Sequence, residues 1–293
     1  MKSTSLNGFL EAELGKPDPD QCLFHVIPAG FEKSVSYGGG TALGPQAILT
    51  ASQYLELYDG VSVPADRGIY TLPPIPGDQS AEDTLSDIEA AVTSVITSKK
   101  IPVLLGGEHT VSVGAFRALS KLDIPMGIVH FDAHADLRDT YEGSNLSHAC
   151  ALHHAVEAGF TVFQIGVRSL STYDVAYREK KSVHCLDAWD LFSKGIPSPL
   201  LPSDFPENIY ITFDVDGLDP SVIPATGTPE PGGLFWFQAM DMLLSSITGR
   251  KVVGFDVVEL APIPGHHASD FAAARLVYNI MGMISRHSRN PQG

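Results

Sequence analysis

Short apolar runs alternate along the chain with longer segments in which apolar residues recur at helical spacing. The runs predict strands at 23–27, 66–70, 101–105, 126–131, 161–165, 183–185, 208–213 and 251–255. The periodic segments predict helices at 44–57, 80–98, 148–158, 172–180, 187–192, 235–246 and 269–286, and another ending near residue 120. Because strands that are apolar on both faces are typical of sheets covered on both sides, this alternation predicts an α/β fold with a mostly parallel sheet.

Neither an internal repeat nor a linker interrupts this pattern, so we expect a single domain over residues 1–293. Residues 1–20 are polar and contain two prolines, which favours a loosely held N-terminal lead-in. Residues 29–44 are rich in glycine and serine and form a loop too long for a plain connector. We weigh two roles for this loop: a lid over a substrate, or a surface loop that contacts another subunit.

Histidine and aspartate residues gather behind three of the predicted strands. They are His109 behind strand 101–105, the trio Asp132, His134 and Asp136 behind strand 126–131, and the pair Asp214 and Asp216 behind strand 208–213. Residues two apart in an extended chain point to the same side. In open α/β sheets, ligands bind beyond the carboxyl ends of the strands, which is where all six residues fall.

Carboxylates held this close repel one another unless a cation lies between them. A strand-end aspartate by itself is more often a turn or helix cap, but so many buried acids together would lack charge partners. Carboxylates with imidazoles and without thiolates suit Mn²⁺, and also Ni²⁺, Co²⁺ or Zn²⁺. Two divalent ions would neutralise four aspartates and activate a water between them. A two-metal phosphoesterase fits the same ligands, but no basic residues cluster to hold a phosphate.

The formal net charge of −15 at pH 7 argues against nucleic acid or an anionic membrane surface as a partner and is compatible with a small cationic substrate. Three widely separated cysteines, Cys22, Cys150 and Cys185, form no disulfide framework. No apolar run approaches the ~20 residues of a membrane span. We therefore expect a cytoplasmic protein.

The motifs together carry a resemblance to a known family. They are Gly106-Gly107-Glu108-His109-Thr110, Phe131-Asp132-Ala133-His134-Ala135-Asp136, the stretch 214–220 with Thr226 to Gly233, and Gly44-Pro45-Gln46-Ala47-Ile48. This set is similar to the ureohydrolases, which include arginase, agmatinase and guanidinobutyrase. The likeness runs from about Val26 to the last predicted helix. It implies a three-layer, arginase-like α/β/α fold, two Mn²⁺ ions per subunit, and a homotrimer or homohexamer.

The resemblance also implies roles for individual residues. His109 and Asp136 would bind one ion, His134 and Asp216 the other, and Asp132 and Asp214 would bridge the two. Guanidinium hydrolysis would proceed by attack of a metal-bridging hydroxide that Asp136 holds by a hydrogen bond.

Residues outside the ligand set complete the implied site. His148 would protonate the departing amine, since an imidazole with a pKa near 6.5 can deliver a proton at neutral pH. Glu259 would pair with the guanidinium. Asn145, Thr226 and Thr228 are further candidate substrate contacts.

The substrate is suggested by residues after strand 161–165. Arginases have an aspartate there to bind the α-ammonium group, whereas this chain has Ser169 and Ser171. The pattern is more like agmatinase, so the expected reaction converts agmatine to putrescine and urea. Guanidinobutyrate or arginine as the substrate, and a non-catalytic family member, remain alternatives. Cys150, close to the proposed proton shuttle His148, leaves sensitivity to oxidation open.

Overall fold

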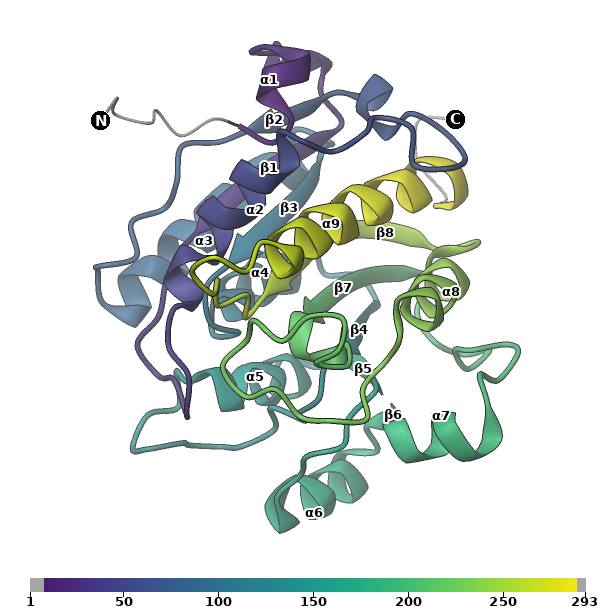
Figure 1. Ribbon diagram of the computed structural model, residues 1–293. Helices are drawn as coiled ribbons and strands as arrows, with labels where there is room; N and C mark the ends of the chain where they lie inside the picture. The colour runs from purple at the N-terminus through teal and green to yellow at the C-terminus, as the bar shows by residue number, and fades with distance from the viewer. Residues whose placement is uncertain (1–7, 289–293) are drawn as a thin grey trace.

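Eight parallel strands lie at the centre of the molecule in the computed structural model, which describes residues 8–288 (Figure 1). Their order across the sheet is β2-β1-β3-β8-β7-β4-β5-β6. The strands are β1 (Phe24–Ala29), β2 (Ile69–Thr71), β3 (Ile101–Gly106), β4 (Met126–Phe131), β5 (Thr161–Ile165), β6 (His184–Leu186), β7 (Asn208–Asp214) and β8 (Lys251–Val258). Every paired neighbour runs parallel, so the predicted fold class is confirmed.

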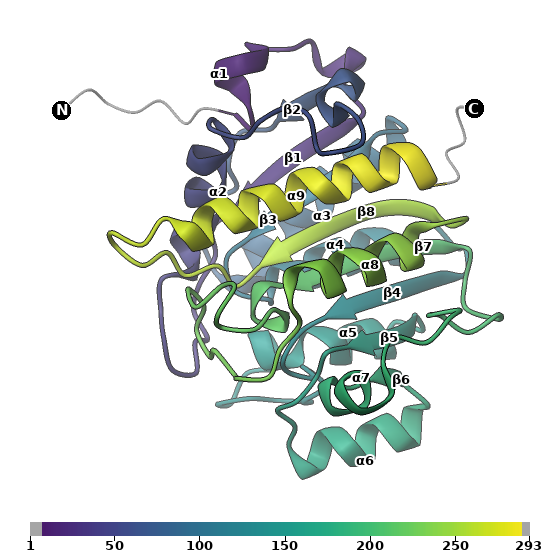
Figure 2. The same cartoon turned by 45° about the vertical axis from the view of Figure 1, so that its right-hand side comes forward.

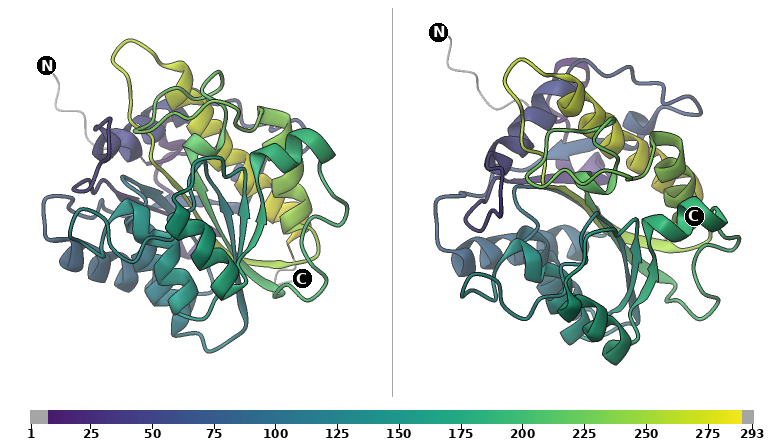
Figure 3. Two further views of the ribbon diagram at one scale, coloured as in Figure 1. Left: turned by 90° about the horizontal axis from the view of Figure 1, so that it is seen from below. Right: turned by 60° about the horizontal axis from the view of Figure 1, so that its bottom comes forward.

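Helices cover both faces of the sheet, as Figures 2 and 3 show. They are α1 (Glu11–Leu14), α2 (Gly44–Ser52), α3 (Ala81–Thr97), α4 (Val111–Ser120), α5 (Ala151–Glu157), α6 (Thr172–Lys181), α7 (Ala188–Lys194), α8 (Trp236–Ile247) and α9 (Ala268–His287). Helices α2, α8 and α9 lie on one face, and α3, α4 and α5 on the other. The three-layer arrangement follows from strands that need apolar cover on both sides.

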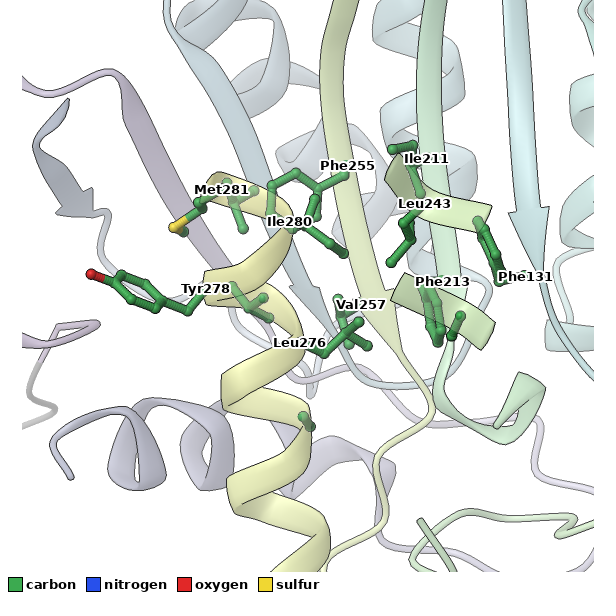
Figure 4. Close-up of a cluster of buried hydrophobic side chains, with 14 of the residues drawn as sticks. Phe131, Ile211, Phe213, Leu243, Phe255, Val257, Leu276, Tyr278, Ile280 and Met281 are labelled. Atoms are coloured by element: carbon green, nitrogen blue, oxygen red, sulfur yellow. The ribbon is translucent and has the colours of Figure 1, made fainter. Parts of the chain in front are cut away.

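Aromatic and aliphatic side chains fill the core beneath α8 and α9 (Figure 4). The rings of Phe131 on β4 and Phe213 on β7 stack with their centroids 4.9 Å apart. Leu243 on α8 and Leu276 on α9 belong to the same buried cluster, and Leu276 lies beside Val257 of β8. Each fully buried side chain of this size contributes about 1.5–3 kcal/mol relative to an exposed one. This packing holds β4 and β7, which carry five of the six predicted metal ligands, in a fixed relation.

The N-terminal segment differs from the expected loose lead-in. Phe9 and Leu10 are buried in the core. The backbone N–H of Leu10 donates to Ser52 Oγ at 3.0 Å, and that of Phe9 donates to Thr71 Oγ1 at 2.9 Å. Two apolar residues anchor a segment that is otherwise polar, and this contact depends on tertiary structure rather than on a local pattern. Residues 1–7 lie outside the described residues.

The central strands place the predicted site. β3, β8, β7 and β4 are consecutive in the sheet, so their carboxyl ends lie side by side at one edge. β8 continues to Val258, and Asp256 is therefore inside the strand rather than at its end. Within residues 8–288, no helix is long and apolar enough to cross a membrane.

Candidate metal centre

Three carboxylates surround one nitrogen of His109. Its Nδ1 atom lies 3.1 Å from Asp136 Oδ2, 3.2 Å from Asp132 Oδ2 and 3.5 Å from Asp214 Oδ2. Despite these short distances, Nδ1 has no partner with hydrogen-bond geometry within residues 8–288. The side chain of His109 is fully buried. The contacts converge on one point from β3, β4 and β7.

A second group forms around His134. Its Nδ1 atom lies 3.0 Å from Asp216 Oδ2 and 3.5 Å from Asp132 Oδ1. Asp132 thus turns one oxygen toward each group. Asp214 presents Oδ2 to the first group while its Oδ1 accepts the backbone N–H of Asp216 at 2.8 Å. The structure places all six predicted metal ligands in two adjoining groups that share Asp132.

The buried acids and imidazoles of this cluster shift one another's pKa values. Burial, together with the charges of Asp216 and Asp132, raises the pKa of Asp214 well above its usual value. Burial opposes protonation of His134, but Asp132 and Asp216 outweigh it and raise the pKa of that imidazole to about 12. Both shifts follow from the crowding of buried carboxylates at this edge of the sheet.

The donors fit a pair of divalent cations. They are imidazole nitrogens and carboxylate oxygens, the ligand types of Mn²⁺ and its neighbours. The buried Nδ1 of His109 has no directed partner in the described part of the chain, and a cation at the convergence point would provide one. Asp132 is oriented to bridge the two groups.

Two site residues adopt a backbone conformation that L-amino acids rarely use. Asp136 has φ 51° and Glu259 has φ 65°. Such residues cost about 1–3 kcal/mol each and persist where the surroundings enforce them. The Glu259 N–H donates to Gly107 O at 2.9 Å. A Cβ at Gly107 would lie 2.0 Å from Phe31 O, so only glycine fits there.

Glu259 and His148 flank the cluster. The side chain of Glu259 is 9% exposed, and its Oε1 accepts the backbone N–H of His109 at 2.6 Å. Both residues line a small inner cavity of about 20 Å³ together with His134, Asp136, Asp214 and Asp216. Thr228 lines this cavity as well. The predicted catalytic side chains therefore share one space with carboxylates of the predicted metal-ligand set.

The loop of residues 30–40 covers this space. Ser34 Oγ lies 3.1 Å from His148 Nδ1, and Ser36 Oγ lies 2.8 Å from His148 Nε2. Val35, Ser36 and Gly38 line the inner cavity. The loop position agrees with a cover over the site, while movement of the loop stays a prediction.

An outer cavity of about 200 Å³ adjoins the inner one. It shares Ser36, His134, Asp136, His148 and Thr228 with the inner cavity. Its further lining residues are Ala135, Arg138, Tyr141, Ala149, Ser169, Leu170, Ser171 and Asp174. Of the other predicted substrate contacts, Thr226 is buried and Asn145 is exposed, and neither lines either cavity.

Comparison with known proteins identifies the family. The model of the arginase family matches residues 23–282. The chain belongs to the arginase family. It is 34% identical to N(1)-aminopropylagmatine ureohydrolase of Synechocystis sp., over 96% of this chain and 95% of that protein. It is 32% identical to agmatinase of Pyrococcus horikoshii, over 94% and 97% of the two chains.

A solved structure supports the same assignment. Agmatine ureohydrolase of Thermoplasma volcanium superposes with a TM-score of 0.86 at 29% identity, covering 96% of this chain and 95% of that one. This chain is therefore an arginase-family ureohydrolase with a His/Asp cluster compatible with a binuclear metal site.

Several contact residues of this arginase-family site were not predicted from the sequence. His130 Nε2 lies 2.7 Å from Asp132 Oδ2, and Thr212 Oγ1 lies 2.8 Å from His109 Nε2. Glu108 accepts hydrogen bonds from the covering loop. For His130 and Thr212 the available signal was a polar residue within an apolar strand, because such a residue needs a hydrogen-bond partner when it is buried.

Cys150 is buried beside the proposed proton shuttle. Burial, with a smaller contribution from the charge of Asp136, raises the pKa of its thiol to about 12. Because the thiolate is the reactive form, this environment makes Cys150 a poor nucleophile and a poor target of oxidation.

Proposed function

We propose that this chain hydrolyses the guanidinium group of agmatine and releases urea and putrescine. The observation that carries the proposal is that Glu259 and His148 line the same inner cavity as Asp136, Asp214 and Asp216. A carboxylate suited to a guanidinium and an imidazole suited to proton transfer therefore lie beside a site for divalent cations.

We assign two Mn²⁺ ions to His109, Asp132, His134, Asp136, Asp214 and Asp216. When bound, divalent ions of this kind lower the pKa of a water molecule toward neutrality. The carboxylate and imidazole donors support this choice, and the same donors also accept Ni²⁺, Co²⁺ or Zn²⁺.

The reaction forms a bond between a water oxygen and the guanidinium carbon and breaks the bond from that carbon to the alkyl-bearing nitrogen. Glu259 pairs with the guanidinium nitrogens, and Asp136 holds the attacking water by a hydrogen bond. His148 gives a proton to the departing nitrogen. The charge balances, because a guanidinium and water become urea and an alkylammonium.

The surroundings of His148 support its role in proton transfer. Hydroxyl groups of Ser34 and Ser36 lie at its two ring nitrogens, at 3.1 and 2.8 Å. Ser34 gives its hydroxyl proton to Glu108 Oε1, so its oxygen accepts from Nδ1–H of His148. The Ser36 hydroxyl at Nε2 can donate to the neutral ring or accept from the protonated one, so either protonation state finds a partner. General acid catalysis of this type contributes about 10²–10⁴-fold to a rate.

The outer cavity supports a substrate with a cationic tail. Asp174 is buried and lines this cavity, and its Oδ1 has no hydrogen-bond partner within residues 8–288. A distal ammonium would give this oxygen a charged partner, worth about 1.5–3 kcal/mol. Arg138 lines the same cavity with its guanidinium over the ring of Tyr141, 4.9 Å from the centroid. A carboxylate tail, as in guanidinobutyrate, would instead pair with Arg138.

A second candidate substrate is N(1)-aminopropylagmatine. Relatives of that name align with this chain over most of their length. The outer cavity of about 200 Å³ also extends the inner one by enough to take a longer tail.

The deciding experiment measures urea release from agmatine, N(1)-aminopropylagmatine, guanidinobutyrate and arginine, each with Mn²⁺, Ni²⁺, Co²⁺ and Zn²⁺. We expect the highest kcat/KM with agmatine and Mn²⁺. Preference for the aminopropyl compound would establish the second candidate. Robust turnover of arginine without turnover of agmatine or of N(1)-aminopropylagmatine would refute both.

A further inference from the structure

Four buried polar side chains form a row across the sheet beneath the metal ligands: Gln164 on β5, His130 on β4, Thr212 on β7 and Asp256 on β8. His130 is in register with both Gln164 and Thr212, and Thr212 is in register with Asp256. None of the four is exposed. Ile128, two residues before His130, packs in the apolar cluster beneath α3 to α5, so the row faces those helices.

Polar side chains in the middle of apolar strands are costly unless their hydrogen bonds are satisfied. A line of four across adjacent strands therefore needs a reason. Gln164 and His130 form one end of the row, where His130 contacts Asp132. Thr212 and Asp256 form the other end, where Thr212 contacts His109.

The hydrogen bonds at the first end determine where the protons lie. Arg178 can only donate, and its Nε donates to Gln164 Oε1 at 2.8 Å. The Gln164 amide nitrogen therefore faces Ala135 O at 2.7 Å and His130 Nδ1 at 3.0 Å, and donates to both. Since His130 Nδ1 accepts, the proton of the neutral ring is on Nε2, which donates to Asp132 Oδ2 at 2.7 Å.

This donor orients the shared carboxylate. Asp132 Oδ2 accepts from His130, and Asp132 Oδ1 accepts the backbone N–H of His134 at 2.6 Å. With one fixed donor on each oxygen, the carboxylate cannot rotate freely, and each oxygen keeps facing its own metal-ligand group. Gln164 also holds the ligand segment directly, because Ala135 lies between His134 and Asp136.

The second end acts on His109 in the same way. The single proton of the Thr212 hydroxyl goes to Asp256 Oδ1 at 2.6 Å. Thr212 Oγ1 therefore accepts from His109 Nε2 at 2.8 Å. With Nε2 as the donor, the lone pair of Nδ1 in the neutral ring points at the carboxylates of Asp132, Asp136 and Asp214.

We propose that this polar row positions the metal ligands: Gln164 acts through His130 on Asp132, and Asp256 acts through Thr212 on His109. All four are positioning residues. Partners of this kind, behind the ligands, typically change metal affinity 10–100-fold when they are removed. The inference rests on the cation site of the proposed function and not on its substrate. If the protein binds Mn²⁺ but does not hydrolyse agmatine, the proposed function is contradicted, whereas the proposed role of the polar row is not.

The first test is the affinity of the metal-free protein for Mn²⁺, measured by titration calorimetry. We expect Thr212→Val to weaken binding about 10–100-fold, because it removes the hydroxyl and keeps the shape. Thr212→Ser should restore affinity to within about threefold of the original. Thr84→Val is the matched control: Thr84 is also fully buried, but it lies on α3, and its hydroxyl has no hydrogen-bond partner within residues 8–288. A Thr212→Val protein that binds Mn²⁺ as tightly as the Thr84→Val protein would overturn the proposal.

Two further measurements address the other end of the row. Gln164→Leu should also weaken Mn²⁺ binding about 10–100-fold. The second measurement needs no variant. Nitrogen NMR of the Zn²⁺-loaded protein should show that His130 is protonated at Nε2 and unprotonated at Nδ1. A proton on Nδ1 would refute the arrangement even if every variant fails to fold. A lower Tm of metal-free Gln164→Leu with unchanged Mn²⁺ affinity would reduce the row to a structural role and contradict the proposal.

Discussion

The hydroxyl of Ser34 donates to Glu108 Oε1 at 2.7 Å, and this contact ties the covering loop to the residue next to the metal ligand His109. The backbone N–H groups of Lys33 and Ser34 donate to Glu108 Oε2 at 2.6 and 2.7 Å. The same serine contacts the ring of His148. Through Ser34, the buried carboxylate of Glu108 therefore connects the covering loop to His148 and to the segment that contains His109.

Replacing this carboxylate by an amide should loosen the loop. In Glu108→Gln the amide NH₂ group would face donors, at a cost of about 1.5–3 kcal/mol for the lost charged hydrogen bonds. We expect kcat/KM to fall about 10–100-fold, by the same energy range, with metal content retained. Steady-state kinetics with metal analysis checks this. Full activity in the variant would show that the loop does not depend on Glu108.

His148→Ala should retain its metal and lose turnover by about 10²–10⁴-fold, because the departing amine would lack its proton donor. His154→Ala on the following helix is the matched control, since the ring of His154 is 2.8 Å from the backbone oxygen of Asn145 and does not line either cavity. Metal content and kcat are measured together. Loss of metal in His148→Ala would remove the shuttle assignment.

Asp132→Asn should lose metal and activity together, because Asp132 is the carboxylate that both ligand groups share. Breaking such a buried charged site typically costs about 3–5 kcal/mol. Elemental analysis after purification, beside a urea-release assay, tests this. Asp139→Asn is the control, since Asp139 is exposed and its ion-pair contact is to His153, 3.7 Å away. An Asp132→Asn protein that stays loaded and active would contradict the metal assignment.

Asp174→Asn should raise the KM for agmatine about tenfold or more, through the loss of a charged hydrogen bond. The KM for butylguanidine, which has no distal ammonium, should stay nearly unchanged. Asp83→Asn is the matched control, because Asp83 and Ser80 pair at the start of α3 as Asp174 and Ser171 do at α6. Equal rises for both substrates would mean that Asp174 only supports the helix.

Asp59 should make stability depend on pH. Burial opposes its ionisation, but the hydrogen bonds from Arg286 and from the backbone of Ser62 and Val61 outweigh burial and lower its pKa. A lowered folded-state pKa stabilises the protein above the unfolded value of about 4, and this stability is lost as the pH falls through the folded value. Urea unfolding should show Asp59→Asn about 1.5–3 kcal/mol less stable at pH 7, with the gap closing below pH 4. A gap of the same size at pH 3 would contradict the account.

Local patterns predicted most elements of the fold. Strand 126–131 and strand 161–165 were predicted with the boundaries that the structure has. The helix predicted over 44–57 ends earlier, at Ser52, where the Gln53 side chain donates to Leu49 O and Gly8 O. That ending depends on the N-terminal segment packing nearby, which no periodicity encodes. The buried contacts of Phe9 and Leu10 escaped prediction for the same reason.

The sequence by itself determined the layers, the parallel sheet and the six metal-ligand candidates, because hydrophobic period and two-residue spacing are local properties of the chain. Only the tertiary structure decided which side chains form hydrogen bonds with those candidates. His130, Gln164, Thr212 and Asp256 are far apart in the chain, and strand order alone brings them into one row. Strand order is set by packing of whole layers, so the row that orients the ligands is visible only once the sheet is assembled.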